Sequence, residues 1–354
     1  MINYFTAMLE RNLFMMTAHL SQTDARLGLL CQWIEQTLGS VTRVSAISGD
    51  ASFRRYFRFV LNSGQRVIGV DAPPEYEDVQ AFVKVQQLLK SLDVRVPDLY
   101  AGDVMQGFLA LEDLGDATLF SVLSEDNVHH WYELALRMAA TMASARPDQA
   151  LPPYDVTLLD REMQLFIDWL LERHLELRLS CREKNWLYDH FERLKQIIAV
   201  QTVGLVHRDF HARNLMVVDH KTLATIDFQD AVIGPVTYDL VSLIKDCYVQ
   251  WPQTLRDRWC DAFREQLKAK GVTVPSQEEF LYWTDTMGIQ RHLKAAGIFA
   301  RLWHRDGKPG YLKDIPRTLS YIEQAGARHD AWRTLGEWVQ DVVQPRLAEV
   351  QEQS

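Results

Sequence analysis

The chain has 354 residues, of which 47% are hydrophobic and 24% are charged, the balance of an ordinary globular protein with ample material for a core. Its net charge of −9 argues against a nucleic-acid partner, because binding a phosphate backbone requires a basic face. No apolar run reaches the length of a membrane span and the four cysteines lie far apart, which argues against a membrane partner and a disulfide framework and favours a cytoplasmic protein.

The first 23 residues are predicted to form an N-terminal tail. Glu10 and Arg11 interrupt its apolar stretch, which leaves that stretch too short for the core of a signal peptide. From Asp24 the pattern becomes helical, with apolar residues at three- and four-residue spacing up to Leu38. Gly39 then occupies the position of a C-cap, so a first helix is expected over 24–38.

Short strands and one helix follow this first helix. Turn-forming residues separate three predicted strands, at 41–47, 53–61 and 66–70. An amphipathic helix is predicted over 79–92, and another strand at 108–111. Residues 24–113 are therefore expected to form a small, mostly antiparallel lobe with one crossing helix.

Helical patterns dominate the rest of the chain, residues 114–354. Apolar residues recur at three- and four-residue spacing in three segments before the middle of the chain, 128–145, 160–175 and 182–200. More helices are expected from Tyr238 to the end. Between these two helical regions, a short stretch with a different pattern carries the residues most informative about chemistry.

This stretch contains the octapeptide His207-Arg208-Asp209-Phe210-His211-Ala212-Arg213-Asn214. It matches H-R-D-x-x-x-x-N, the pattern of a kinase catalytic loop, in which the Asp accepts the proton of the attacking hydroxyl and the Asn holds a magnesium ion. A lone Asp or Asn in a loop is more often a turn or cap residue, but the whole pattern is much more specific. Asp209 is thus the candidate general base and Asn214 a candidate metal ligand.

The segment after Asn214 is predicted to be a β-hairpin. Residues 215–218 and 223–226 have the composition of two buried strands, and a polar turn connects them. Because a hairpin brings its two ends together, Asn214 and Asp227 should lie side by side. An amide oxygen and a carboxylate are hard ligands suited to a magnesium ion that bridges the phosphates of ATP. The sequence therefore predicts phosphoryl transfer from a nucleotide, with ATP and Mg²⁺ as cofactors.

These segments also carry a resemblance to known families. His207–Asn214 together with Ile226–Asp230 resembles the aminoglycoside phosphotransferase and choline kinase-like superfamily, which is protein-kinase-like in fold. A narrower similarity, to the bacterial anomeric kinases of N-acetylmuramate and N-acetylglucosamine, rests on residues 227–240, 71–75 and 290–294. The likeness runs from about Asp24 to near the C-terminus.

The resemblance implies an α+β, two-lobe, protein-kinase-like fold. A small antiparallel β-sheet lobe (24–113) would bind the nucleotide, and a larger, mainly helical lobe (114–354) would hold the catalytic loop and the pocket for the acceptor sugar. The implied activity is ATP-dependent phosphorylation of the anomeric hydroxyl of both sugars to the α-1-phosphate, in peptidoglycan recycling. Two alternatives stay open: a kinase of another small alcohol, such as an aminoglycoside or choline, and a catalytically inactive nucleotide-binding regulator.

A protein substrate is not expected. After Asp227 the chain has no Asp-Phe-Gly and no Ala-Pro-Glu, and the connection is too short for an activation loop. In the superfamily the first residue of the catalytic motif usually holds the loop, so His207 is interpreted as structural. Asp239 can be an N-cap near the start of a helix; a matching Asp in the superfamily braces the catalytic loop, and we interpret it in that way.

Nucleotide contacts are predicted at two places in the smaller lobe. The turn 48–52 takes the place of the nucleotide-covering loop, where side chains and backbone N–H groups would cradle phosphates. The segment 112–114 matches the hinge between the two lobes, where backbone groups would bind the adenine edge. The candidate residues are Ser52, Phe53, Arg54, Arg55, Glu112 and Leu114. The third strand contains no lysine to pair with the phosphates. Either an arginine at position 54, 55 or 58 supplies that charge, or magnesium carries more of it.

Substrate contacts are predicted for His211, Arg213, Asp230 and Arg291. Arg291 belongs to a basic stripe with Lys294 and Arg301 on a helix expected around 287–303. One interpretation of the stripe is a solvated helix face, since Lys and Arg are usually exposed. The other is that one of the three, Arg291 first, binds the lactyl carboxylate of N-acetylmuramate through two parallel hydrogen bonds.

Overall fold

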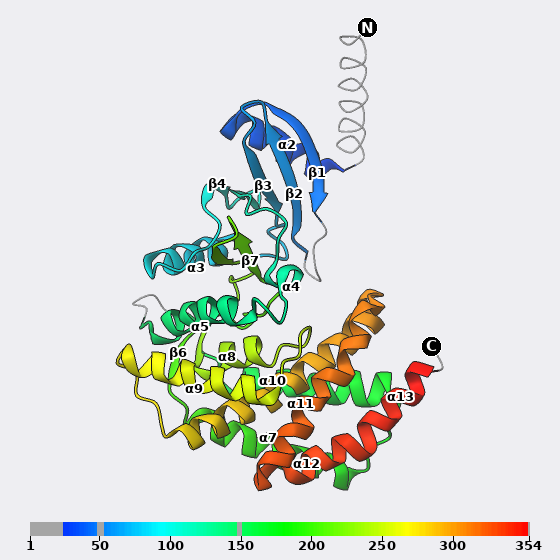
Figure 1. Ribbon diagram of the computed structural model, residues 1–354. Helices are drawn as coiled ribbons and strands as arrows, with labels where there is room; N and C mark the ends of the chain where they lie inside the picture. The colour runs from blue at the N-terminus through cyan, green and yellow to red at the C-terminus, as the bar shows by residue number, and fades with distance from the viewer. Residues whose placement is uncertain (1–23, 48–52, 147–150, 353–354) are drawn as a thin grey trace. The chain divides into compact units, whose positions relative to one another are not determined.

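The computed structural model describes residues 24–47, 53–146 and 151–352 (Figure 1). They form two compact units. The N-terminal unit falls within Met1–Lys90 and Arg95–Asp116, and the C-terminal unit comprises Ser91–Val94 and Ala117–Ser354. Among the elements that the structure describes, helix α3 (Val79–Ser91) alone crosses this division, and its last residue is counted with the C-terminal unit.

The N-terminal unit contains a five-stranded antiparallel sheet (Figure 1). Its order is β1-β2-β3-β5-β4, with bounds β1 Val41–Ile47, β2 Arg55–Leu61, β3 Arg66–Asp71, β4 Leu99–Asp103 and β5 Phe108–Glu112. The prediction of an antiparallel sheet is confirmed. The sequence did not predict β4, because Gly102 and Asp103 are residue types depleted in strands; β2 begins later than expected, at Arg55.

Helix α2 (Ala25–Leu38) packs on this sheet as its apolar spacing predicted. The Asp24 carboxylate caps its start by accepting from the Leu27 backbone N–H at 3.1 Å. At its end Gly39 adopts a φ of 112°, a conformation that favours glycine. The core of the unit consists of the buried face of α2 and one face of the sheet, with Leu27, Leu30, Ile34, Phe57, Phe59, Leu61, Val67, Phe108 and Ala110.

The C-terminal unit is mainly helical. Its helices before the octapeptide His207–Asn214 are α4 Leu119–Val122, α5 Val128–Ser144, α6 Val156–Leu165, η1 Phe166–His174 and α7 Cys181–Ala199. Two small antiparallel sheets follow, made of β6 Val203–Val206 with β9 Val232–Pro235, and β7 Leu215–Val218 with β8 Thr222–Thr225. The remaining helices are α8 Thr237–Ile244, α9 Gln253–Ala269, α10 Gln277–Asp306, η2 Pro309–Asp314, α11 Ile315–Arg328, η3 Asp330–Trp332, α12 Arg333–Trp338, η4 Val339–Val343 and α13 Gln344–Glu352.

The helix predicted over 160–175 starts earlier than expected and changes its winding partway along. Its start is four residues earlier because the Asp155 carboxylate accepts from the Leu158 N–H at 2.9 Å and caps the helix there. From Phe166 onward it winds as a π-helix. The long helix α10 crosses it at this change in winding, where Gly297 lets the two backbones touch: a Cβ at position 297 would lie 2.4 Å from the carbonyl carbon of Leu165.

Helix α10 is the central element of the C-terminal unit. It packs against α6, η1, α7, α8, α9 and α11, and most of its residues from Thr284 to Leu302 are buried. The large core around it therefore holds not only apolar residues but also several charged side chains, which makes their pairing important.

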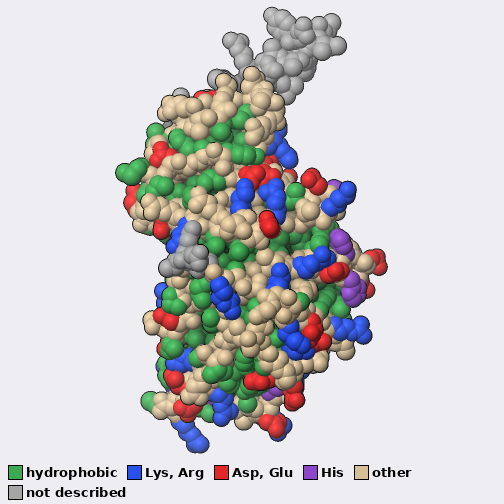
Figure 2. All heavy atoms as spheres, turned by 90° about the vertical axis from the view of Figure 1, so that its left-hand side faces the viewer, with side chains coloured by type: hydrophobic (Ala, Val, Ile, Leu, Met, Phe, Trp, Pro, Cys, Tyr) green, Lys and Arg blue, Asp and Glu red, His purple; other side chains and the backbone are tan. Residues whose placement is uncertain are grey.

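The surface carries charges of both signs. On the face drawn in Figure 2, acidic and basic side chains lie interspersed. Within the described ranges, no helix is long and apolar enough to cross a membrane. The four cysteines are free thiols, of which Cys247 and Cys260 are buried.

Candidate active site

The β7–β8 hairpin brings the predicted metal-binding positions together. The ladder pairs Leu215 with Thr225, and beyond it the Ile226 N–H donates to the Asn214 carbonyl at 3.0 Å. Asp227, the next residue, therefore lies beside Asn214. The hairpin predicted from the sequence is confirmed, with a returning strand that starts one residue earlier than expected.

The orientation of Asn214 follows from one hydrogen bond. Its Nδ2 donates to the backbone carbonyl of Asp209 at 3.0 Å, which ties the two ends of the catalytic loop and leaves Oδ1 as the atom for a cation. Asp227 has a φ of 63°, and its Oδ1 accepts from the Gln229 side chain at 3.0 Å. A left-handed backbone at a non-glycine residue is uncommon and is found preferentially at functional sites.

The catalytic loop is braced by a buried carboxylate on α8. Asp239 accepts from the backbone N–H groups of His207 at 2.7 Å and Arg208 at 3.0 Å. His207 is also buried, with its Nε2 2.7 Å from the Thr225 hydroxyl on the hairpin. The bracing interpretation of Asp239 is confirmed, and the N-cap alternative is wrong because residue 236 holds that position. His207 likewise joins the loop to the hairpin.

A second buried carboxylate, Asp246, was not predicted. It accepts from the N–H of Ala212 in the catalytic loop at 2.9 Å and from the N–H of Tyr248 at 2.7 Å. Burial raises the pKa of Asp246 to about 6, against the effect of these two hydrogen bonds. The sequence signal was an acidic residue just after the largely apolar run 240–244.

Asp209 lies half-buried, and two of the residues that lower its pKa, Lys294 and Arg291, belong to α10. Burial alone would raise its pKa, but Lys294, His211, Arg291 and Arg208 outweigh that effect and hold the pKa of Asp209 at about 2. The carboxylate is therefore ionised at neutral pH, as a proton acceptor must be. This arrangement suits a residue that orients a hydroxyl and takes its proton.

Two of these cations share one buried partner, Glu162 on α6. Its Oε1 lies 2.6 Å from Arg208 Nη2 and 3.1 Å from Lys294 Nζ. Glu162 Oε2 accepts two hydrogen bonds, one from the Tyr154 hydroxyl at 2.5 Å and one from the Gln290 amide nitrogen at 3.2 Å. Glu162 was missed by the sequence analysis. Its signal was its place on the apolar face of the helix, between Leu159 and Met163.

The predicted substrate residues lie in different environments. Burial lowers the pKa of His211 to about 3, so its ring is neutral, and its buried Nδ1 has no hydrogen-bond partner among the described residues. Arg213 stacks on Tyr248, with its guanidinium carbon 3.7 Å from the ring centroid. Asp230 is exposed and accepts from the Gln229 side chain at 3.2 Å.

The basic stripe on α10 is not a solvated face. Arg291 is 6% exposed and Lys294 is 9% exposed, and the interpretation of the stripe as a solvated helix face is therefore wrong for both residues. Arg301 is half-buried. Trp303, near the end of the same helix, is 40% exposed. The periodicity of α10 failed as a guide because the helix is packed on nearly all sides.

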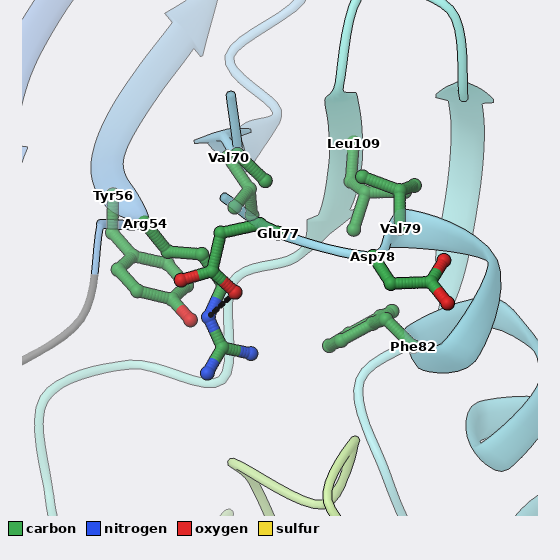
Figure 3. Close-up of a pocket in the computed structure, with 9 residues that line it drawn as sticks. Arg54, Tyr56, Val70, Glu77, Asp78, Val79, Phe82 and Leu109 are labelled. Carbon is green, nitrogen blue, oxygen red and sulfur yellow. Dashed lines mark ion pairs between the residues drawn. The ribbon is translucent and has the colours of Figure 1, made fainter. Parts of the chain in front are cut away.

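One of the nucleotide candidates in the N-terminal unit, Arg54, lines a small pocket. Arg54 Nε lies 3.3 Å from Glu77 Oε2, and Figure 3 shows the two side chains pointing toward each other beside Tyr56, with Phe82 across the pocket. Phe53, next in the chain, is largely exposed and stacks on Tyr76 with 4.4 Å between ring centroids. Ser52 lies outside the described residues.

The other nucleotide candidates are held in ion pairs of the same unit. Arg55 contacts the carboxylates of Asp24 and the fully buried Asp71. Arg58 contacts Asp113 and Asp116, each at 2.8 Å. Glu112 lies 2.5 Å from Arg95 Nη2 and also accepts from the Asp98 N–H at 3.1 Å; Leu114 is half-buried.

Solved structures of similar fold are small-molecule kinases. The choline kinase LicA from Streptococcus pneumoniae superposes with a TM-score of 0.60 at 13% identity, over 84% of this chain and 99% of that one. The ethanolamine kinase of Plasmodium vivax also gives 0.60, at 10% identity, over 84% and 87% of the two chains. At these identities the likeness shows the fold, which is protein-kinase-like: an antiparallel sheet unit and a mainly helical unit that carries the braced H-R-D-x-x-x-x-N loop.

Sequence relatives define the family more narrowly. Residues 43–275 match the phosphotransferase enzyme family, and the chain belongs to it. It is 39% identical to an N-acetylmuramate/N-acetylglucosamine kinase of Pseudomonas putida, over 90% of this chain and 97% of the relative. The kinase of the same name from Pseudomonas aeruginosa is 41% identical, over 89% and 96%, and that of Neisseria meningitidis 36%, over 80% and 85%.

Proposed function

We propose that this phosphotransferase is a cytoplasmic, ATP- and Mg²⁺-dependent sugar kinase. Its acceptor would be the anomeric hydroxyl of N-acetylmuramate and N-acetylglucosamine, giving the α-1-phosphate for peptidoglycan recycling. The observation that carries the proposal is the assembly of Asp209, Asn214 and Asp227 at one braced hairpin. It stands in a chain that is 36–41% identical to three relatives named for those two sugars.

In this proposal Asp209 is the general base. Its low pKa keeps it ionised, so its main contribution would be to orient the sugar hydroxyl and to take its proton late in the transfer. The brace from Asp239 and the bond from Asn214 fix the loop that carries it, which limits the misplacement that lowers rates.

Asn214 Oδ1 and the Asp227 carboxylate would hold magnesium. No group of three His, Cys, Asp or Glu side chains in the described parts of the chain is arranged to bind a metal. An ion held by this Asn–Asp pair would therefore depend on waters and phosphate oxygens for its other ligands, which is how magnesium usually binds. When bound, the ion would neutralise negative charge on the phosphates of ATP.

Arg54 is the proposed substitute for the missing lysine of the third strand. Arg54, just before β2, forms an ion pair with Glu77, just before α3. This pair between a cation beside the sheet and a glutamate near the following helix resembles the lysine–glutamate pair that kinases use to hold the α- and β-phosphates. Phe53 and Leu114 stay candidates for nucleotide contact. The ion pairs that Arg55 and Glu112 form favour structural roles for those two residues.

His211, Arg213 and Asp230 are the proposed residues around the acceptor. The unpartnered ring nitrogen of His211 can bind a sugar hydroxyl, and the Arg213–Tyr248 stack offers a flat surface for a pyranose ring. Cationic acceptors such as choline or aminoglycosides are less compatible, because the buried guanidinium of Arg291 would repel them near the catalytic base.

A substrate panel tests the proposal. The purified protein would be incubated with γ-labelled ATP and, separately, N-acetylmuramate, N-acetylglucosamine, an aminoglycoside and choline. We expect label on the two N-acetyl sugars alone, none in EDTA, and recovery when magnesium is added in excess. Transfer to choline or the aminoglycoside would favour the alternative kinase, and transfer to no acceptor, with nucleotide still bound, would favour an inactive regulator.

A further inference from the structure

We propose that Arg291 is a preformed carboxylate site that recognises the lactyl group of N-acetylmuramate. This inference rests on the proposed function and names the residue that would distinguish its two acceptors. N-acetylmuramate is N-acetylglucosamine with a lactyl ether on O3, so the two sugars differ by one carboxylate and the short chain that carries it.

The contacts of Arg291 are poor for a buried cation. Its Nη1 donates to the Cys247 sulfur at 3.7 Å, and its buried Nε has no hydrogen-bond partner among the described residues. Within the same residues no carboxylate oxygen lies within ion-pair distance, that is 4.0 Å, of its guanidinium. The nearby Asp246 carboxylate uses its two oxygens for the backbone N–H groups of Ala212 and Tyr248.

Other buried cations of the unit are better satisfied. Lys245 pairs with Asp285, and Lys294 pairs with Glu162 at 3.1 Å. Arg256, which also has no carboxylate partner in the described part of the chain, donates to the Gln324 amide oxygen at 2.6 Å and lies over the ring of Tyr321. A buried charge without such partners is strongly destabilising, so an anion supplied by a ligand is the natural complement of Arg291.

The position of Arg291 is close to the reacting groups. Its contact Cys247 lies between Asp246, which binds the catalytic loop at Ala212, and Tyr248, whose ring packs edge-on against that of His211 at 5.2 Å. The guanidinium also contributes to the low pKa values of both Asp209 and His211. A carboxylate bound there would belong to a molecule whose hydroxyl can reach Asp209.

The chemistry favours a carboxylate over a neutral group. A guanidinium offers two parallel N–H donors that match the two oxygens of a carboxylate, and such charge-assisted pairs are about twice as strong as neutral hydrogen bonds. Arg291 can use Nε and a terminal nitrogen for this purpose. N-acetylglucosamine would leave the same donors to water, at some loss of affinity but with its anomeric hydroxyl unaffected.

The test is a double-mutant cycle that removes either the guanidinium of Arg291 or the carboxylate of the sugar. Initial rates would be measured for wild type and Arg291→Gln with N-acetylmuramate and with its methyl ester, which removes the charge and adds one methyl group. In wild type we expect kcat/KM for the acid to exceed that for the ester by about 10- to 100-fold. In Arg291→Gln the acid should fall to the level of the ester, because the two changes remove the same interaction.

N-acetylglucosamine and a second variant provide the controls. The loss in kcat/KM caused by Arg291→Gln should be about tenfold smaller for this sugar than for N-acetylmuramate. Arg301→Gln, on the same helix and half-buried, should not change the preference between acid and ester. Arg291→Lys, which keeps the charge but loses the fork, should recover part of the preference and serves if the glutamine variant does not fold.

Two results would overturn the assignment. If wild type uses the methyl ester as well as the acid, the protein does not recognise the carboxylate at all. If Arg291→Gln stays folded and lowers activity on both sugars equally, Arg291 acts on a part that they share. By contrast, a wild type that phosphorylates neither sugar would refute the proposed function itself, so the two failures are distinguishable.

Discussion

Two buried clusters of charge meet helix α10, and they differ in how completely their members are paired. Around Asp285 the carboxylate contacts Lys245, Arg328 at 3.2 Å and His329 at 2.7 Å, and Arg328 also contacts Asp257 at 2.8 Å. Each cation of that cluster therefore touches a carboxylate. Around Asp209, Arg208 and Lys294 share Glu162, and Arg291 touches no carboxylate among the described residues.

The difference separates two uses of a buried charge. A completely paired cluster has no binding capacity left, so its effect falls on stability, where the loss of one partner is severe. A cluster with an unused donor beside an ionised carboxylate is incomplete without its ligands, as expected of a site that receives an acceptor and a phosphoryl group. Substitutions in the two clusters should accordingly change different measurements.

The largest effect is expected for Asp209→Asn. Removal of the proposed general base should lower kcat by about 10²–10⁴-fold and leave nucleotide affinity close to that of wild type. Because the Asp209 side chain makes no structural hydrogen bond in the described residues, the thermal unfolding midpoint should change little. Wild-type turnover in this variant would refute the assignment, and a large loss of stability would show that Asp209 belongs with the structural cluster.

A large effect on stability is expected for Asp285→Ala. The variant leaves Lys245 buried without a partner and should lose about 3–5 kcal/mol in the free energy of unfolding, measured by urea denaturation. Glu172→Ala, which breaks the exposed pair with Lys184, is the matched control and should change stability by at most about 1 kcal/mol. Replacing both Asp285 and Lys245 by apolar residues should recover much of the loss; no recovery would mean that the pair is not the cause.

A smaller effect is expected from acid. Burial opposes ionisation of Asp285, but Lys245, His329 and Arg328 outweigh it and lower its pKa. A lowered carboxylate pKa stabilises the fold at pH values above the ordinary pKa of about 4, and this contribution is lost as the pH falls below it. Unfolding curves between pH 7 and pH 3 should show this loss in wild type and a weaker one in Asp285→Asn. Parallel curves for the two proteins would contradict the account of this cluster.

The parts of this fold and site that could be predicted from sequence are local. The strand over 41–47, the first helix and the catalytic hairpin follow from short-range alternation, capping and turn residues. The roles proposed for Asp209, Asn214 and Asp227 depend on an eight-residue pattern and on the two ends of one hairpin. Such features need no knowledge of how distant segments pack.

The parts that could not be predicted depend on distant partners. Glu162 precedes Arg208 by 46 residues, and nothing near either position identifies the other. The two arginines at 55 and 58 look equally available for phosphates until the structure shows their carboxylate partners. The burial of Arg291 is hidden in the same way, because helical periodicity assumes one solvated face and α10 has almost none.

The most direct test of the central claim is ³¹P-coupled NMR of the product that wild type forms from ATP, magnesium and N-acetylglucosamine or N-acetylmuramate. A kinase of the anomeric hydroxyl attaches phosphorus to O1, so we predict a sugar phosphate whose phosphorus couples to H1 in the α-configuration. A phosphate on any other hydroxyl, or ADP formation without a sugar phosphate, would contradict the account.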